Sequence, residues 1–501
     1  MFYNNNLGLK NITYKKYNLT SFAKGMNTNI DEQLLPLTTA VSTYNLNFNN
    51  GALKTGMGVK EVSLSYSFDN RNLKKTFNKI TGVNILGVWE YSRWNSAMDR
   101  FEKYLLVYGS DGYMYQGYLY FELPTFLKIT ALHFATMPNV VNYYLNGLDV
   151  ALISSDSDGM WVWTPEKTPY KVNNAPKISS MCLHYERLFA TISGDNRTIW
   201  FSDDLDPTNW NVSLSEGGFI SLYDERGGAN KIVRFQDHLY VFREFGISRI
   251  TAYANQENFS VAHLFTSSGR VYDKTIAVCG NRIMFLANDG IYSFNGSTTS
   301  KLDLKLDKLL KNVTNENAVG VYFNGKYYLT LRLKFNDNRK IYCENNTDYV
   351  NNAMIELDLK TGDINFMRGI DVRNLGTVNT ELDSALLCLV RQADEIFLEQ
   401  FYDDCGKYIA NNTYKGWQSP KTSFGYPLKE KLIKSITLVT KYDLEITIDL
   451  DGVKTVYKLK GKDIPQTIYP NRKGYLFSIE FYTQLAEAYI TNSSIVVGLL
   501  W

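Results

Sequence analysis

Two groups of closely spaced carboxylates are the residues whose types could support catalysis. Asp203-Asp204 with Asp206 form one group, and Asp403-Asp404 form the other. A glycoside hydrolase needs two carboxyl groups ~5–9.5 Å apart on either side of a sugar, whereas adjacent residues of a strand point to opposite faces. We therefore predict that SDDLDPTNW is a capped turn initiated by Asp206-Pro207. A weak calcium site there stays open as an alternative, because hard oxygen ligands suit that ion.

A second stretch, SSDSDGMWVW (Ser154–Trp163), resembles the S-x-D-x-G-x-T-W turn of sialidases. Gly159 falls one position late relative to Asp156, and the pattern occurs once. That turn stabilises a fold and performs no catalysis. The prediction here is a plain hairpin turn with tryptophans in the core.

Other chemistry-bearing residues show no spacing typical of an active site. No G-x-S-x-G elbow, P-loop or G-x-G-x-x-G occurs, and the four histidines show no H-x-x-x-H pairing. The five cysteines are Cys182, Cys279, Cys343, Cys388 and Cys405. Disulfide frameworks and zinc sites need tighter spacing, so we expect buried free thiols in a protein assembled in reducing cytoplasm. We predict no catalytic centre, no cofactor and no metal ion.

The length, the net charge and the apolar runs of the chain limit the classes of protein to which it could belong. A chain of 501 residues is too long for one ordinary core, so two or more domains are expected. The net charge is only +2, whereas a dedicated nucleic-acid-binding protein is strongly basic. Charge is mildly uneven, with +2 over residues 1–70, −4 over 71–414 and +4 over 415–501. We expect no signal peptide and no membrane span, because no apolar run approaches ~20 residues.

The elements that position these residues repeat along the chain. From about Leu105 to Phe401, β-rich runs alternate with Asx-Gly or X-Gly pairs, as in RIMFLANDGIYSFNG. Such pairs are strong hairpin signals, because type I′ turns need φ > 0. The turn glycines stand 35 to 52 residues apart, about 42 on average: Gly112, Gly159, Gly194, Gly246, Gly290, Gly325 and Gly362. Hairpin units repeating every ~40–50 residues are typical of propeller blades. We predict an all-β fold with a β-propeller over residues 71–412, of about six blades, with seven as the alternative.

One segment of this region predicts a helix. In SKLDLKLDKLLKNV, apolar residues fall on one helical face, at Leu302, Leu306, Leu309, Leu310 and Val313. Ser300 stands where it could cap the first turn. We expect an amphipathic helix of about three turns packed on the rim of the propeller.

The two ends of the chain differ from the middle. Residues 413–501 contain period-2 strands, with Leu444, Ile446, Ile448 and Leu450 alternating with polar residues and Asp451-Gly452 as the turn. They predict a separate antiparallel, sandwich-like β domain. Residues 1–70 are polar and asparagine-rich and form no obvious core alone. We predict that they are an arm that packs elsewhere or on a neighbouring subunit.

Within Phe22–Gly58 the arm carries a motif that resembles the opening of phage tail nozzle proteins. Its elements are Gly25, Asp31, Leu35-Pro36, Ala40, Asn45, Gly51 and Leu53. Three later stretches resemble the same group: ERLFAT…IWFSDDLDPTNW (Glu186–Trp210), LYVFREFGISRI (Leu239–Ile250) and FLANDGIYSFNG (Phe285–Gly296). The resemblance covers about residues 20–300. The C-terminal β domain departs from it, which leaves the partner of that domain open.

The family is that of the packaged-DNA stabilisation, or tail hub, proteins of short-tailed phages. The resemblance implies a β-propeller subunit in a six-fold homo-oligomeric ring below the head–tail connector. It further implies a non-enzymatic virion protein of the tail that is assembled in the host bacterial cytoplasm. The expected partners are connector proteins, tail fibres or spikes, and packaged double-stranded DNA that passes through the lumen without sequence-specific binding. The near-zero net charge is compatible with DNA sliding. The alternative is a carbohydrate-binding or carbohydrate-cleaving propeller used in host recognition, which clustered carboxylates with shifted pKa values in its funnel would favour.

Apolar residues of the arm are the candidates for assembly. They are Phe22, Leu34, Leu35, Pro36, Leu37 and Phe48, with Val41 and Leu46. A polar segment of this kind gains most by packing on an existing surface, because ordering it costs entropy. In a cyclic ring, the arm of each subunit could bind the neighbouring subunit and so hold the ring together. We therefore expect deletion of residues 1–50 to leave a folded propeller that no longer forms rings.

Overall fold

The computed structural model describes residues 12–19, 22, 26–49, 51–68, 71–77, 79–120, 126–253, 255–266, 269–302, 305–335, 350–408 and 411–500. Gly25 of the N-terminal motif and Cys343 lie outside these ranges.

Six sheets are each built from four strands that follow one another along the chain. Their strands are β7 (Ile85–Asn95), β8 (Arg100–Gly109), β9 (Tyr113–Tyr118) and β10 (Leu127–His133); β11 (Asn139–Leu145), β12 (Leu148–Ser155), β13 (Gly159–Thr164) and β14 (Lys167–Val172); β15 (Ile178–His184), β16 (Arg187–Ile192), β17 (Asp195–Phe201) and β18 (Gly218–Ser221); β19 (Ala229–Phe235), β20 (His238–Arg243), β21 (Gly246–Thr251) and β22 (Ser260–Thr266); β23 (Val271–Cys279), β24 (Arg282–Ala287), β25 (Gly290–Phe294) and β26 (Thr299–Lys301); and β27 (Val319–Phe323), β28 (Lys326–Leu331), β29 (Ala353–Asp358) and β30 (Ile364–Arg368). Each is an up-and-down antiparallel sheet, which is the form of a propeller blade.

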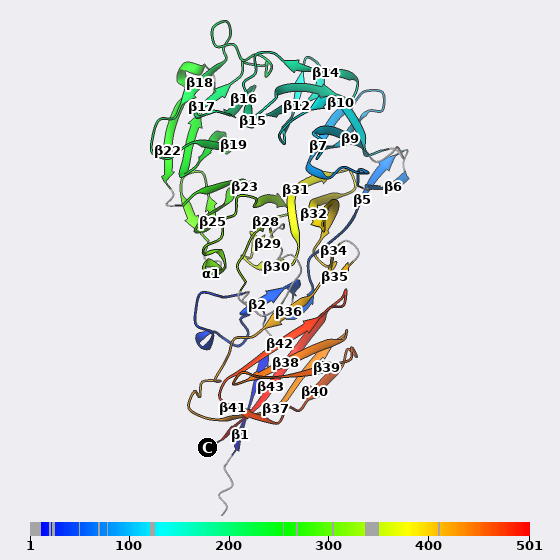
Figure 1. The fold of residues 1–501 in the computed structure, drawn as a ribbon, viewed down its shortest axis with the longest axis vertical. Coiled ribbons are helices and arrows are strands. Elements are labelled where there is room, and N and C mark those ends of the chain that lie inside the picture. The colour runs from blue at the N-terminus through cyan, green and yellow to red at the C-terminus, as the bar shows by residue number, and fades with distance from the viewer. Residues whose placement is uncertain are drawn as a thin grey trace, which may run out of the picture.

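The seventh sheet closes the ring with strands from both ends of the propeller sequence. It contains β31 (Asp371–Asn379), β32 (Ser384–Gln392), β33 (Glu395–Tyr402) and β5 (Gly58–Phe68). β5 pairs antiparallel with β33, and β6 (Arg71–Phe77) pairs with the far edge of β5. β31 in turn contacts β7 of the first blade. The fold is therefore a β-propeller, and Figure 1 shows its blades around a common centre. Apolar cores lie between neighbouring blades, as where Tyr91 and Leu106 meet Ile153.

The propeller has seven blades, the alternative rather than the estimate of about six. Five of the predicted turn glycines stand between the second and third strands of their blades. Gly325 and Gly362, however, both belong to the sixth blade. The corresponding turn of the seventh blade has Ala393, with φ 52°, in place of glycine. Glycine spacing undercounts blades because a left-handed turn position can hold another residue.

The predicted three-turn helix is wrong. α1 spans Asp307–Leu310 alone, because Thr299–Lys301 form β26 and pair with β25. Ser300 thus lies in a strand, and Lys305 has φ 57°, which is incompatible with a continuous right-handed helix. The apolar stripe is nevertheless buried between the fifth and sixth blades, at Leu306, Leu309 and Leu310.

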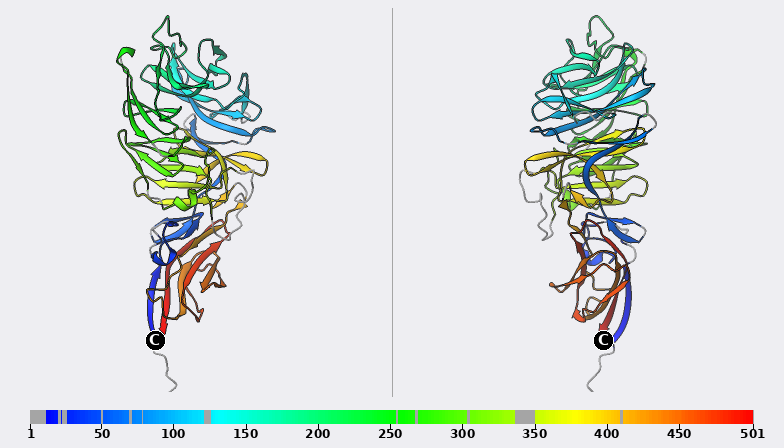
Figure 2. Two further views of the ribbon diagram at one scale, coloured as in Figure 1. Left: turned by 60° about the vertical axis from the view of Figure 1, so that its left-hand side comes forward. Right: turned by 90° about the vertical axis from the view of Figure 1, so that its right-hand side faces the viewer.

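The second module is a sandwich of two sheets. The seven-stranded sheet contains β1 (Ile12–Leu19), β3 (Leu46–Asn49), β4 (Ala52–Thr55), β37 (Lys431–Thr440), β40 (Pro465–Ile468), β41 (Arg472–Gly474) and β43 (Tyr489–Leu500). The five-stranded sheet contains β2 (Ser42–Tyr44), β36 (Lys415–Gln418), β38 (Leu444–Leu450), β39 (Val453–Leu459) and β42 (Phe477–Thr483). Short elements complete the chain: β34 (Lys407–Tyr408), β35 (Asn411–Asn412) and the 3-10 turns η1 (Glu32–Leu34) and η2 (Gln256–Asn258). The sandwich lies at one end of an elongated molecule, beyond the sixth and seventh blades (Figures 1 and 2).

The predicted C-terminal hairpin is confirmed. Leu450 pairs with Val453 across Asp451-Gly452, whose φ angles are 51° and 88°. The four alternating apolar residues of β38 are buried in the core between the two sheets.

The described part of residues 1–70 is not a free arm. β1 and β4 pair with β43, β3 pairs with β4, and β2 pairs with β36, so these strands complete the sandwich of the same chain. β5 belongs to the propeller. Without this N-terminal contribution β43 and β36 would each have an unpaired edge. The pairing is non-local, so local spacing does not reveal it.

Buried polar residues join the two modules. Asn45, with φ 58°, accepts from the N–H of Arg368 at 2.9 Å and from the Tyr408 hydroxyl at 2.8 Å, and it donates to Tyr414 O at 2.6 Å. Lys415 Nζ donates to the carbonyl oxygens of residues 406, 413 and 485, at 3.2, 3.1 and 2.5 Å. These bonds link the end of the propeller to the sandwich at fully buried positions.

Candidate functional site: an acidic surface and a basic face

The predicted capped turn at Asp203–Asp206 is confirmed. Asp203 Oδ1 accepts from the N–H of Glu216 at 3.1 Å, and Oδ2 accepts from Asn209 Nδ2 at 2.9 Å. Asp206 Oδ1 accepts from the N–H and the hydroxyl of Thr208, at 3.0 and 2.6 Å. Both carboxylates therefore act as turn-forming groups.

The remainder of this loop, which ends at Gly217, is also held by its own side chains. Trp210 is buried between the second and third blades, and its Nε1 donates to Pro207 O at 3.0 Å. Asn211 Oδ1 accepts from the N–H groups two and three residues later, at 3.0 and 3.3 Å. Leu214 is consequently held out in solvent, with 87% of its surface exposed.

Carboxylates and tyrosines gather around this loop on the second and third blades. The Tyr143 hydroxyl donates to Leu205 O at 3.2 Å. Burial raises the pKa of Tyr143, and so do three nearby carboxylates: Asp206, Glu186 and Asp204. Residues 139–222, which form the two blades, carry 10 acidic and 5 basic side chains, a net −5. We call Glu186, Asp204, Leu205, Asp206 and Leu214 the acidic surface.

The seven-stranded sheet of the sandwich has the opposite character. Its described strands contain no acidic residue. They contain seven basic residues: Lys15, Lys16, Lys54, Lys431, Lys434, Arg472 and Lys473. Residues 1–57 and 413–501 together hold 17 basic and 10 acidic residues, a net +7, whereas residues 58–412 hold 36 and 41, a net −5. The small net charge of the chain therefore conceals two modules of opposite sign.

Several of these cations lie on one side of the sheet. Lys16, Lys54 and Lys473 alternate along their strands with positions that face the core, so they point to solvent. Lys434 stands at a bulge of β37, and its Nζ lies 4.3 Å from the ring centre of Tyr14. The ion pairs in the described part of the sandwich involve other lysines, so these four charges are uncompensated. We call Tyr14, Lys16, Lys54, Lys434 and Lys473 the basic face.

The fold also assembles a serine, a histidine and an aspartate that sequence reasoning missed. Ser248 Oγ lies 3.0 Å from His263 Nδ1, and His263 Nε2 lies 3.1 Å from Asp224 Oδ2. A nucleophilic serine must reach its substrate, but Ser248 is 0% exposed. Asp224 is also paired with Arg243 at 2.7 Å and Arg226 at 3.3 Å. The arrangement ties a loop to two strands. Its Ser–His half could have been found from the register of the β21–β22 hairpin.

Two described carboxyl groups have a raised pKa, and both are packed inside the seventh blade. Burial raises the pKa of Asp371, which accepts from the N–H of Asn351 at 3.0 Å and from Arg373 Nε at 2.8 Å. Burial, and then the charge of Glu61, raise the pKa of Glu399 to about 7. They lie on different strands, β31 and β33, and do not form a solvent-facing pair of the kind a glycosidase uses.

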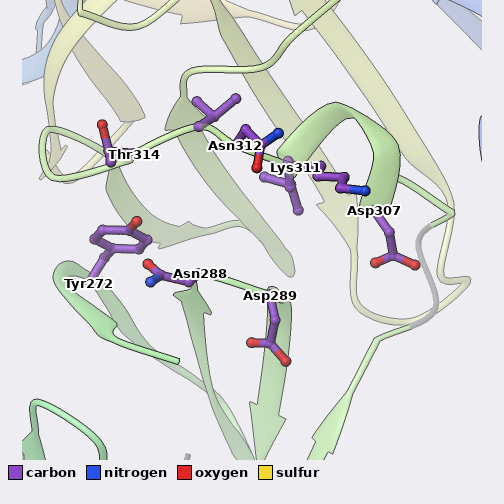
Figure 3. Close-up of a pocket in the computed structure, with 9 residues that line it drawn as sticks. Tyr272, Asn288, Asp289, Asp307, Lys311, Asn312 and Thr314 are labelled. Carbon is purple, nitrogen blue, oxygen red and sulfur yellow. The ribbon is translucent and has the colours of Figure 1, made fainter. Parts of the chain in front are cut away.

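A cavity of about 540 Å³ lies between α1 and the β24–β25 turn (Figure 3). Asp289 and Asp307 line it together with Lys311. Asp289 Oδ2 accepts from the Tyr292 hydroxyl at 2.6 Å, and Asp307 pairs with Lys301 at 3.3 Å. Protein groups thus already engage both carboxylates.

The other residues singled out in the sequence occupy turns, exposed positions or the core. Gly159, with φ 81°, forms the predicted hairpin turn, with Trp163 buried and Trp161 half-buried. Asp403 and Asp404 are exposed where the seventh blade leads to the sandwich. The four described cysteines are free and three of them are buried, as expected. Within the described residues, no group of three His, Cys, Asp or Glu side chains could hold a metal ion.

Most of the predicted assembly residues lie inside the chain's own sandwich. Phe22 is buried, with its ring 5.0 Å from that of Trp417, and Leu35 is buried as well. Leu37 and Phe48 pack against the same core. Leu34 and Pro36 are exposed, and Leu34 retains 77% of its surface. Of the six, Leu34 and Pro36 are therefore the exposed residues, while Leu37 and Phe48 are half-buried.

No family model and no curated relative matches the sequence. One solved chain that it resembles is that of "BBS1N in complex with ARL6DN", with 9% sequence identity and a TM-score of 0.41; the match covers 68% of this chain and 97% of that chain. Another is that of "YCF48 bound to D1 peptide", with 11% identity and a TM-score of 0.35; this match covers 60% of this chain and 99% of that chain. Similarity at this level says nothing about activity or partners. Among the described residues, no helix is long and apolar enough to cross a membrane.

Proposed function

We propose that the protein is a non-enzymatic component of a bacteriophage tail, a nozzle or hub subunit that forms a homo-oligomeric ring below the head–tail connector. In this role it lines part of the DNA ejection channel, helps to retain packaged DNA and anchors fibres or spikes. The proposal starts from the resemblance of residues 22–58 and of three propeller stretches to that family.

One observation carries the proposal: the motif-bearing N-terminal segment joins the two modules. Asn45, a motif residue, is buried at the junction and bonded to both sides. Gly56 and Gly58, which follow the motif, lie so close to other backbone that an added Cβ would stand 2.4 Å from it. A rigid two-module body suits a ring that must bear the pressure of packaged DNA without changing shape.

Microscopy of the full chain mixed with its connector tests this proposal. We expect closed rings of one fixed copy number seated on the connector, with a lumen wide enough for duplex DNA. A chain that remains monomeric and free of the connector at every concentration would contradict it.

The runner-up, a carbohydrate-directed propeller, makes a different prediction. It requires turnover or binding of polysaccharides that depends on the Asp203–Asp206 or Asp403–Asp404 carboxylates. We expect no turnover of sialosides, polysaccharides or peptidoglycan, and intact assembly in Asp203→Asn and Asp404→Asn. Hydrolysis that either substitution abolishes would favour the enzyme.

A further inference from the structure

We propose that the acidic surface of one copy docks on the basic face of the next copy, in a heterologous contact between propeller and sandwich. The inference rests on the proposed function only for the premise that copies of the chain associate. It names the two surfaces that meet.

The two surfaces lie too far apart to neutralise each other within one chain. The second and third blades stand at the end of the long axis opposite the sandwich, as the three views of the molecule agree (Figures 1 and 2). Exposed charges separated by more than about 8 Å are largely screened at physiological ionic strength. Within the acidic surface, Arg187 pairs with Asp204 at 3.9 Å, and it also pairs with Glu216 of the same loop, whereas Glu186 and Asp206 have no ion pair among the described residues. Each chain therefore still offers one surface of each sign, which is what a head-to-tail contact requires.

The acidic surface is already ordered for binding. The loop from Asp203 to Gly217 contains four acidic residues and no basic one. Its backbone is held by the Asp203, Asp206 and Asn211 side chains. A rigid surface loses little conformational entropy on association, so more of the contact energy remains as affinity.

The basic face is matched to such a partner. Lys16, Lys434 and Lys473 are exposed and carry no ion pair among the described residues. Opposing the three carboxylates of the acidic surface with these lysines gives electrostatic complementarity, which favours one partner and one register.

Apolar residues favour a protein partner over nucleic acid. Ile12 and Tyr14 are exposed beside the lysines, and Leu205 and Leu214 are exposed beside the carboxylates. Burying such side chains against each other is favourable, whereas a phosphate backbone offers them nothing comparable. Duplex DNA would also be repelled by the acidic surface, so it could explain only half of the pattern.

Charge reversal on each side tests the contact in the full chain. The variant of the basic face, called the face variant, is Lys434→Glu/Lys473→Glu. The variant of the acidic surface, called the surface variant, is Glu186→Lys/Asp204→Lys. The matched control is Lys454→Glu/Lys462→Glu, which changes the charge by the same amount elsewhere on the sandwich. Sedimentation velocity measures self-association, and circular dichroism with thermal melting checks that each variant is folded.

We expect each reversal to weaken self-association by ~10-fold or more, because like charges then oppose each other. The control should associate as the wild type does. Combining the face and surface variants should restore association to within ~3-fold of the wild type, since the pairs are then reversed but complementary.

Three outcomes would overturn the inference. The first is a combined variant no better than its parents, and the second is a surface variant that associates normally. The third is loss of binding to a duplex of about 20 base pairs in the face variant while self-association is unchanged, which would make nucleic acid the occupant. If all variants still form rings on the connector, this contact is refuted and the proposed ring function stands.

Discussion

At the scale of single residues, Glu399 ties the closure of the propeller to pH. It lies on β33 directly opposite Glu61 of β5, at the seam where the two ends of the propeller sequence pair, and it is 5% exposed. Its pKa of about 7 exceeds the usual value near 4.5, so the folded state holds this proton more tightly than the unfolded chain. The free energy of unfolding therefore falls as pH rises from about 4.5 to about 7.

Glu399→Gln removes that dependence. We expect the variant to gain stability over the wild type by up to about 3 kcal/mol at pH 8, with little difference at pH 4.5. Urea unfolding at the two pH values measures it. Glu395→Gln, an exposed carboxylate of the same strand, is the control and should behave as the wild type. Parallel pH profiles for the wild type and Glu399→Gln would show that this carboxyl is not the titrating group.

Lys415 is a second residue with a testable role, at the junction of the modules. Burial lowers the pKa of its amine to about 8, and three backbone carbonyls accept hydrogen bonds from it. Lys415→Met would remove these three hydrogen bonds, although the carbonyl of residue 406 would keep its bonds from Thr413, at a cost of about 1–3 kcal/mol. We expect a lower Tm and faster proteolysis between the propeller and the sandwich. Lys454→Met, at an exposed position, should change neither, and equal effects from both substitutions would argue against the junction role.

At the scale of elements, two blade turns distinguish the two reasons why a position requires glycine: a positive φ angle and a lack of space for a Cβ atom. Gly112 and Gly325 have nearly equal φ angles, 82° and 81°. An added Cβ at Gly112 would stand 2.7 Å from His133 Nε2 and 3.0 Å from Phe134 O, whereas at Gly325 nothing lies within 4 Å. Gly325→Ala should cost about 1 kcal/mol of unfolding free energy, from backbone strain alone. Gly112→Ala should lower the free energy of unfolding by more than Gly325→Ala does. Equal decreases for the two variants in chemical unfolding would mean that β10 shifts to accommodate the added Cβ.

The N-terminal strands give the other prediction at this scale. Deleting residues 1–50 removes β1, β2 and β3 and leaves β5 in place, so we now expect a folded propeller with an unfolded sandwich. The reason is that β43 would lose its partner along Ile12–Leu19. Hydrogen exchange should show lost protection in β37 and β43, while deletion of residues 1–11 should preserve it. Full protection of both strands in the longer truncation would show that the C-terminal strands fold alone.

At the scale of the whole molecule, the division of charge predicts a salt-dependent assembly. Screening lengths fall from about 14 Å to about 4 Å between 50 mM and 500 mM salt. Self-association through the acidic surface and the basic face should weaken by ~10-fold or more over that range. Leu214→Ser should weaken association at both salt concentrations, because it removes apolar burial rather than charge. Light scattering measures both effects, and association that does not respond to salt would exclude these surfaces.

The sequence by itself determined the features that depend on neighbours along the chain. The all-β class, the hairpins at Gly159 and Asp451-Gly452, the alternation in β38 and the capped turn at Asp206 all follow from local backbone preference and period-2 burial. Tertiary structure decided what depends on pairing across long separations. β5 closes the seventh blade from more than 300 residues away, and β1 to β4 complete a sandwich whose other strands lie at the opposite end of the chain. The charge counts along the sequence already gave basic ends and an acidic middle, but only the fold joins the two ends into one module of net +7 beside a propeller of net −5.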